Sequence, residues 1–169
     1  MKYYVLDGYN VIHAVPSLNR LLDKSLEAAR EELIHLCARF KKGRSDVKKM
    51  VIVFDGKSEH EDLPQKSFPG LQIIFTRTSE DADDRIISVL EGINRSEHVF
   101  VVSDDNYVCN QARTHNATPT SSSRFFSELK TLIEGSKHPK HIEKSPKEKT
   151  LSATEARKIT EEYRKFLGI

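Results

Sequence analysis

The sequence lacks several features that would place it in a specialised class of protein. Only two cysteines occur in 169 residues, Cys37 and Cys109, and they form no CxxC motif. We expect both to be reduced, largely buried thiols within helices. No apolar run approaches the length of a membrane-spanning helix, and the first residues predict a strand rather than a secretory leader. We therefore expect a cytoplasmic protein without a membrane partner.

Common cofactor and metal motifs are also missing. No GxGxxG follows any expected strand, which disfavours a dinucleotide-dependent enzyme. The seven histidines are scattered without the spacing of a zinc site. We find no internal repeat and no low-complexity tract, so the chain is most simply one domain with some additional chain.

A large excess of charge is absent too, because the net charge is only +2. The total therefore indicates neither a nucleic acid nor a membrane partner, and the distribution is more informative. Acids gather at 80–84 and 104–105, whereas Lys and Arg gather at 39–49 and 137–149. Such segregation predicts an acidic site beside a basic surface. Segment 137–149 is either a solvated linker or a contact for phosphate groups, while 39–49 is expected mainly to be a solvated helix end.

Four apolar runs without polar alternation predict strands buried on both faces, as in a parallel sheet. They lie at 3–6, 50–54, 71–75 and 99–102, and a weaker fifth strand is expected around 116–118. Between the first two, Pro16 stops any long helix, so 11–12 is expected to be a short turn. Ser25 and Gly43 then bound a predicted helix. Two further helices are expected to begin near residues 80 and 106, and two more are expected to span about 122–133 and about 153–166.

This alternation predicts an α/β protein with three layers and a mostly parallel central sheet. Beyond residue 135 the chain becomes rich in Lys, His and Pro, with almost no apolar residues until the last helix. We therefore divide it into a domain at 1–135, a basic linker at 136–152 and a C-terminal helix at 153–169.

Aspartates follow three of the predicted strands. Asp7 ends the first, Asp55 the second and Asp104 the fourth, while Asp83 opens the helix after the third. In a parallel sheet these positions lie at one edge, where α/β proteins bind ligands. Each has an ordinary alternative, because Asp-Gly is a common turn dipeptide and acids complement helix starts. Their coincidence at one edge is what favours a site.

Converging carboxylates repel one another unless protons or a cation offset their charge. Mg²⁺ is usually held by one or two carboxylates together with water and phosphate oxygens, and it can activate water against a phosphodiester. On the helix, Asp83 shares a face with Ile87 and Leu90, which should point at the sheet. Asp84 lies on the face of Ser88 and is expected to be solvated. Asp83 is therefore favoured as a ligand.

These motifs, taken in order, resemble the NYN domain of the PIN-like nuclease superfamily, and more narrowly its YacP-like bacterial branch. The resemblance rests on Asp7-Gly8-Tyr9-Asn10, Val53-Phe54-Asp55 and Ala82-Asp83-Asp84-Arg85-Ile86, and it runs from Met1 to about Leu132. It implies a Rossmann-like PIN fold and a Mg²⁺- or Mn²⁺-dependent endoribonuclease that leaves a 5′-phosphate and a 3′-hydroxyl. It also implies mRNA as the substrate, presented on a ribosome or another complex.

Carried over residue by residue, the resemblance implies that Asp7 and Asp83 are the principal catalytic metal ligands. Asp104 is the third acid, and Asp55 ligates the metal or lies behind the ligands. Asn10 would orient ligands or phosphate at the mouth of the site. Three further groups of residues complete the expectation: Tyr9 stacks a base or packs over the first turn, Arg77 and Arg124 hold phosphate or pair with the acids, and Asp84 and Ser103 lie behind the ligands.

Two other functions remain open. A receiver-like module also gathers acids around Mg²⁺, and here Asp55 would accept the phosphoryl group. It should carry a Lys at the end of its last strand, where this chain has Ala117-Thr118-Pro119-Thr120. An RNA-binding protein that keeps the fold without cleavage is disfavoured by the intact acids, although only activity decides. The sequence gives no direct indication of oligomeric state.

Overall fold

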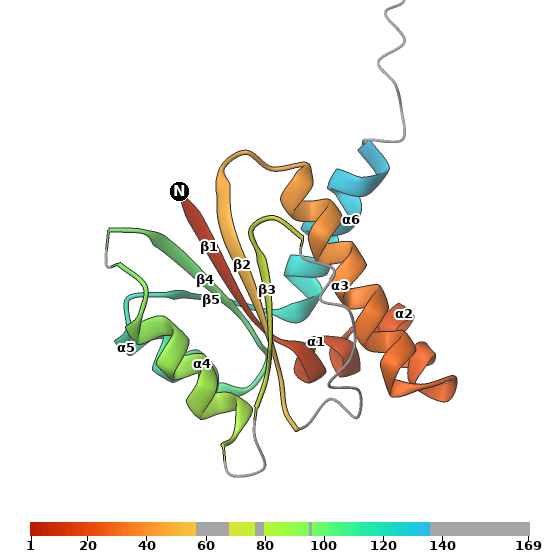
Figure 1. Ribbon diagram of the computed structural model, residues 1–169, viewed down its shortest axis with the longest axis horizontal. Coiled ribbons are helices and arrows are strands. Elements are labelled where there is room, and N and C mark those ends of the chain that lie inside the picture. Colours follow the sequence, from red (N-terminus) through yellow and green to blue (C-terminus); the bar gives the residue numbers. More distant parts are fainter. Residues whose placement is uncertain (57–67, 77–79, 95, 136–169) are drawn as a thin grey trace, which may run out of the picture. The chain divides into compact units, whose positions relative to one another are not determined.

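The centre of the structure is a five-stranded sheet in which every strand is parallel to its neighbours. The computed structural model describes residues 1–56, 68–76, 80–94 and 96–135. The strand order is β3-β2-β1-β4-β5, with β1 in the middle (Figure 1). The strands are β1 (Lys2–Asp7), β2 (Val47–Phe54), β3 (Leu71–Phe75), β4 (His98–Val102) and β5 (Thr118–Thr120). The predicted α/β fold is confirmed.

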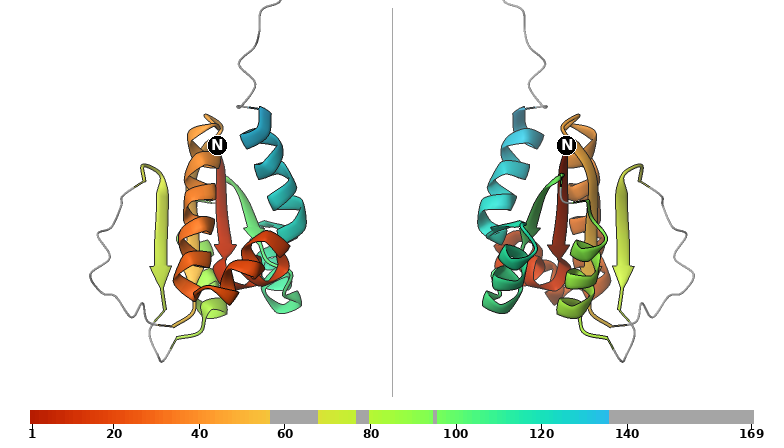
Figure 2. Two further views of the ribbon diagram at one scale, coloured as in Figure 1. Left: turned by 90° about the vertical axis from the view of Figure 1, so that its right-hand side faces the viewer. Right: turned by 90° about the vertical axis from the view of Figure 1, so that its left-hand side faces the viewer.

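Helices cover both faces of this sheet, which gives the three expected layers (Figures 1 and 2). On one face lie the helices that pack together around α3, and on the other lie α4 and α5. Their bounds are α1 (Gly8–Ala14), α2 (Pro16–Asn19), α3 (Leu26–Lys42), α4 (Ala82–Glu91), α5 (Asn106–Thr114) and α6 (Ser122–Gly135), and the 3₁₀ helix η1 (Arg20–Asp23) precedes α3. No helix in these described parts is long and apolar enough to cross a membrane.

Two hydrophobic cores explain why the strands read as continuous apolar runs. Successive side chains of a strand point to opposite faces. Leu6 and Ile52 are fully buried in the core with α1, α3 and α6, whereas Val5 and Val53 are fully buried in the core with α4 and α5. Because both faces are covered, residues 50–54 of β2 are all apolar and buried, and the two lysines of this strand lie near its start.

The local signals for α3 act as the sequence predicts. The Ser25 hydroxyl accepts a hydrogen bond from the N–H of Ala28 at 3.0 Å, and Gly43 caps the other end. Such a cap satisfies one of the unpaired N–H groups at a helix start. The helix spans Leu26–Lys42, in agreement with the prediction.

The expected turn at 11–12 is wrong, because these residues lie within α1. The Asp7 carboxylate caps α1 by accepting a hydrogen bond from the N–H of Asn10 at 3.2 Å. Pro16 occupies the first position of α2, where its missing N–H costs nothing. The fifth strand lies slightly later than expected, at Thr118–Thr120 on the sheet edge, where Pro119 is tolerated.

The predicted linker at 136–152 and the helix at 153–169 lie outside the described residues. The same holds for the basic segment 137–149 and for Arg77. These expectations remain predictions.

Candidate active site

Asp7 lies at the carboxyl end of the central strand and is half-buried. One carboxylate oxygen accepts from the N–H of Asn10 at 3.2 Å, and the other accepts from the Ser103 hydroxyl at 3.3 Å. The pKa of Asp7 is raised to about 6, chiefly by burial; the charges of Asp83 and Asp105 also raise it, while the hydrogen bonds from Asn10 and Ser103 lower it. A negative charge at this position is therefore costly until a cation or proton offsets it.

Asp83 is the acid of α4 that approaches Asp7. It is half-buried in the first helical turn, whereas the neighbouring Asp84 is exposed. Burial raises the pKa of Asp83, and the charge of Asp105 is the next largest cause. The helix buries Leu90, as expected, but the second buried residue is Ile86, whereas Ile87, which was expected to point at the sheet, is only half-buried.

Asp104 and Asp105 both follow β4, but their carboxylates have different hydrogen-bond partners. The exposed Asp104 accepts a hydrogen bond from the N–H of Ser122 at 3.2 Å, at the start of α6. Asp105 caps α5 by accepting from the N–H groups of Tyr107 and Val108, and its charge raises the pKa of both Asp7 and Asp83. Asp105 is therefore an acid of the site that the motif order did not select.

Ser103 and Asn10 hold these segments together. The Ser103 side chain is buried; its hydroxyl donates to Asp7 and accepts from the N–H of Asp105 at 3.1 Å. The side-chain amide oxygen of Asn10, Oδ1, accepts from the N–H of Asp104 at 2.8 Å and from the Ser122 hydroxyl at 3.5 Å. Asn10 thus joins α1, the loop after β4 and the start of α6.

Asp55 connects the ends of β2 and β3. It is exposed, and its carboxylate accepts from the Thr76 hydroxyl at 2.9 Å. That hydroxyl in turn accepts from the N–H of Gly56 at 3.0 Å. The charge of Asp55 also raises the pKa of Asp83, so Asp55 belongs to the outer part of the acidic group.

Tyr9 packs over the first turn, which is one of its two expected arrangements. Its ring lies 5.3 Å from the ring of Phe54, and its hydroxyl accepts hydrogen bonds from the Arg30 guanidinium. Arg124 is exposed and lies 3.8 Å from Glu128 on its own helix rather than beside the acids. Arg30, which no sequence motif indicates, thus contacts Tyr9, a predicted site residue.

Comparison with known proteins decides the family. Residues 4–167 match the sequence model of the YacP-like NYN domain. The chain belongs to this family. NYN domains are PIN-like nucleases, so the coarse class inferred from the motifs is confirmed, as is the resemblance to the YacP-like branch.

Relatives from Bacillus subtilis support this membership. The YacP protein of strain 168 is 29% identical over 107 residues, a stretch that covers 63% of this chain and 62% of that protein. A crystal structure of a point mutant of Rae1 (YacP) is 27% identical, with a TM-score of 0.65 over 80% of this chain and 79% of that one. Another crystal structure of Rae1 (YacP) has a TM-score of 0.68 at 23% identity, over 99% and 88% of the two chains, and shows the shared fold.

The acids of this NYN domain fit a hard divalent cation. Within 1–56, 68–76, 80–94 and 96–135, no three His, Cys, Asp or Glu side chains are grouped closely enough to enclose a metal by themselves. Mg²⁺ does not require such a cage, since one or two carboxylates and several waters are its usual ligands. Asp7 and Asp83 provide carboxylate oxygens whose raised pKa values indicate charge that the protein leaves without compensation. These two residues would hold the ion.

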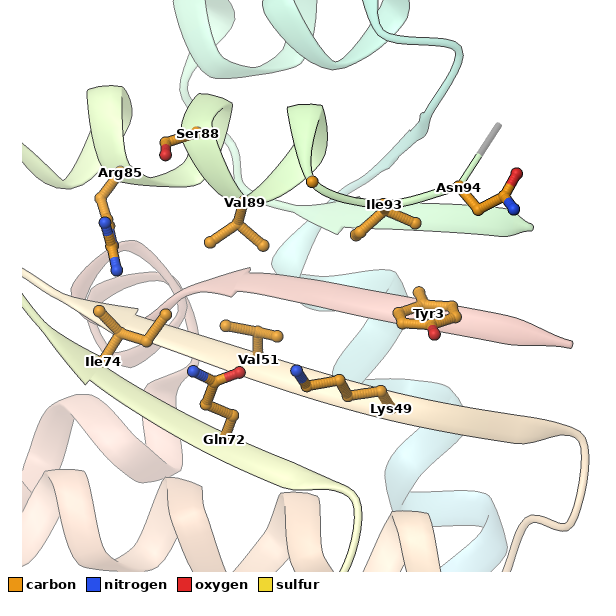
Figure 3. Close-up of a pocket in the computed structure, with 11 residues that line it drawn as sticks. Tyr3, Lys49, Val51, Gln72, Ile74, Arg85, Ser88, Val89, Ile93 and Asn94 are labelled. Atoms are coloured by element: carbon orange, nitrogen blue, oxygen red, sulfur yellow. The ribbon is translucent and has the colours of Figure 1, made fainter. Parts of the chain in front are cut away.

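A cavity of about 470 Å³ in the NYN domain lies between α4 and the faces of β1, β2 and β3 (Figure 3). Figure 3 shows Arg85 extending from α4 toward the strands. Its Nε is buried and has no hydrogen-bond partner among the described residues, while its Nη1 lies 3.6 Å from Glu80. Tyr3 and Lys49, at the start of their strands, also line the cavity, so it extends away from the acids at the carboxyl edge.

Proposed function

We propose that this protein is an endoribonuclease that hydrolyses RNA phosphodiester bonds with the help of a carboxylate-bound Mg²⁺ or Mn²⁺. The proposal is carried by one observation, the convergence of Asp7, Asp83 and Asp105 at the carboxyl edge of the sheet in a domain of a nuclease family. These acids repel one another at the edge of the sheet where ligands are expected to bind, and a bound cation would offset their charge.

In this proposal the side chains around Asp7 prepare it as a ligand. The N–H of Asn10 and the hydroxyl of Ser103 each hold one carboxylate oxygen, so the orientation of the carboxylate is fixed before any ligand binds. When bound by Asp7 and Asp83, a divalent cation supplies an activated water and stabilises charge on the phosphate. Hydrolysis then adds the water oxygen to phosphorus and breaks the bond to the 3′-oxygen, which takes up a proton. The products carry a 5′-phosphate and a 3′-hydroxyl.

The decisive experiment measures cleavage of a 5′-labelled single-stranded RNA by the full chain with Mg²⁺, Mn²⁺ or EDTA. Asp7→Asn and Asp83→Asn should each lower the rate by on the order of 100-fold or more, because a neutral amide is a poor ligand for a hard cation. Asp84→Asn is the matched control, since Asp84 is exposed on the same helical turn. Cleavage that survives both substitutions, or that is insensitive to EDTA, would rule out the proposal.

The third acid can be assigned in the same assay. The resemblance to the family implies Asp104 as the third acid. Asp105 is the alternative, because its charge raises the pKa values of Asp7 and Asp83. Replacement by Asn preserves an oxygen that can accept the hydrogen bonds at Ser122 and at the start of α5. The larger loss of cleavage between Asp104→Asn and Asp105→Asn therefore identifies the acid that acts on the substrate.

We further propose mRNA as the substrate, with a ribosome as the setting in which it is presented. A parallel reaction should therefore supply a translated mRNA on ribosomes beside the free RNA. Cleavage only on ribosomes would support presentation by the ribosome, and equal cleavage of free RNA would argue against it. RNA binding without cleavage in either reaction would instead identify an RNA-binding protein that has lost the activity.

A further inference from the structure

Arg30 lies against three aromatic rings near the carboxyl edge of the sheet. It extends from α3, and the centre of its guanidinium lies 5.3 Å from the ring of Tyr9, 5.9 Å from that of Phe54 and 5.4 Å from that of Phe75. Phe54 and Phe75 are the last residues of β2 and β3. Arg30 is therefore held where the neighbouring strands end.

Hydrogen bonds fix the direction of the guanidinium. Its Nε donates to the Tyr9 hydroxyl at 2.7 Å, and its Nη2 donates to the same oxygen. Tyr9 lies two residues after Asp7, so these hydrogen bonds join Arg30 to the segment that carries the first acid of the site. An arginine has five N–H donors in a planar fork. The third nitrogen, Nη1, has no hydrogen-bond acceptor among the residues that the structure describes.

The charge of Arg30 has no carboxylate partner among the described residues. All six ion pairs found in this part of the chain involve other groups. Aromatic faces attract a cation but do not cancel its charge. A half-buried guanidinium with unused donors is therefore matched to an anion that approaches from outside, and phosphate oxygens fit its fork geometry.

We propose that Arg30 binds a phosphate of the RNA strand beside the bond that is cleaved, with Tyr9 and the two phenylalanine rings holding the guanidinium in place. The inference rests on the proposed function, because it identifies the substrate as a phosphodiester chain at this edge. It also gives the acidic edge a cation, which Asp7, Asp83 and Asp105 need if an anionic strand is to approach them. A purely structural Arg30 would only attach α3 to Tyr9.

The test separates RNA binding from cleavage. Binding of a fluorescein-labelled single-stranded RNA is measured by anisotropy in EDTA at several salt concentrations. Arg30→Gln should weaken binding about tenfold, as expected for a lost charge-assisted hydrogen bond. The slope of log affinity against log salt should fall by about 0.7, the value for one phosphate contact on a single strand. Arg39 is an exposed arginine of the same helix, so Arg39→Gln is the matched control; it should leave both the affinity and the salt slope nearly unchanged.

Two more variants distinguish phosphate binding from packing. Tyr9→Phe keeps the ring on Phe54 but removes the oxygen that orients Arg30, so binding should weaken while the salt slope is retained. Arg30→Lys keeps the charge and should retain the salt slope, although it loses the fork. If Arg30→Gln lowers the melting temperature, binding is measured at a temperature at which this variant is still folded, and a salt slope equal to that of Arg39→Gln there overturns the proposal.

The outcomes also separate this inference from the proposed nuclease activity. If the wild type binds and cleaves RNA but Arg30→Gln matches Arg39→Gln in affinity and slope, the phosphate site is wrong and the activity stands. If Arg30→Gln weakens binding while the wild type never cleaves, Arg30 is an RNA contact and the nuclease proposal fails. A wild type that binds no free RNA overturns the phosphate site, and it overturns the nuclease proposal as well if RNA on ribosomes is not cleaved either.

Discussion

At the scale of single residues, Asp7 has two opposite effects on stability: its carboxylate caps α1, but its negative charge lowers the stability of the folded state. The carboxylate caps α1, yet burial and the nearby acids raise its pKa to about 6 from an ordinary value of 3.8. An acid whose pKa is higher in the folded state lowers stability as pH rises through this interval. The penalty is therefore absent below about pH 4 and fully present above about pH 6.

Asp7→Asn should consequently stabilise the metal-free protein at neutral pH. Asn keeps an oxygen for the N–H of Asn10 and removes the charge, so we expect a gain of about 1–3 kcal/mol at pH 7.5. The gain should shrink toward zero near pH 4. Thermal unfolding followed by circular dichroism in EDTA measures both values, with Asp84→Asn as the control. A variant less stable than the wild type at pH 7.5 would contradict this account of Asp7.

Adjacent residues of the site also show what the sequence could not predict. Strand ends and parallel order placed Asp7, Asp83 and the Asp104–Asp105 pair at one edge. The pattern cannot say which of two neighbouring loop carboxylates turns toward Asp7, because that depends on hydrogen bonds to Ser122 and to the start of α5. Nor does any local signal connect Arg30 to Tyr9, which lie 21 residues apart in the chain.

At the scale of secondary structure, strong local signals predicted α3 and β3 well. Ser25 and Gly43 bound the helix, and residues 71–75 form the third strand as expected. The sequence does not predict the first helix, because Val11-Ile12 before Pro16 resembles a turn; Asp7 does end β1, but it also caps α1. The cap is local, but the packing of Tyr9 on Phe54 joins α1 to the end of β2, which the local sequence of α1 does not show.

The start of α1 should tolerate no side chain at Gly8. An added Cβ would lie 2.4 Å from two ring atoms of Phe54 and 3.0 Å from the carbonyl oxygen of Val53. Phe54 is fully buried and stacks on Phe75, so it has little room to move. Gly8→Ala should lower the free energy of unfolding by about 1–3 kcal/mol, the usual cost of overpacking.

Urea denaturation measures this loss, and Gly92→Ala provides the control. At Gly92 the nearest atom to an added Cβ lies 3.6 Å away, which is ordinary contact. If Gly8→Ala were as stable as Gly92→Ala, the close contact between α1 and the end of β2 would not exist in solution. A change in Gly8→Ala activity larger than its loss of stability explains would show that the same contact positions Asp7.

At the scale of the whole molecule, RNA binding needs more positively charged side chains than the described residues place at the acidic edge. The net charge of +2 cannot attract a polyanion strongly, and Arg30 is a single charge. The sequence concentrates five lysines in 137–149, at positions 137, 140, 144, 147 and 149. We expect this segment to supply phosphate contacts that raise affinity without taking part in hydrolysis.

Replacing these five lysines with glutamine should weaken RNA binding and flatten its salt dependence while leaving the cleavage rate at saturating RNA unchanged. If three or four of the lysines contact phosphates, the slope of log affinity against log salt falls by about 2 to 3. Exposed cations at the end of α3, Arg39 and Lys42, are replaced together as the control and should change the slope far less. An unchanged slope in the five-lysine variant would identify 137–149 as a solvated linker, and a lower saturated rate would instead implicate it in the cleavage step.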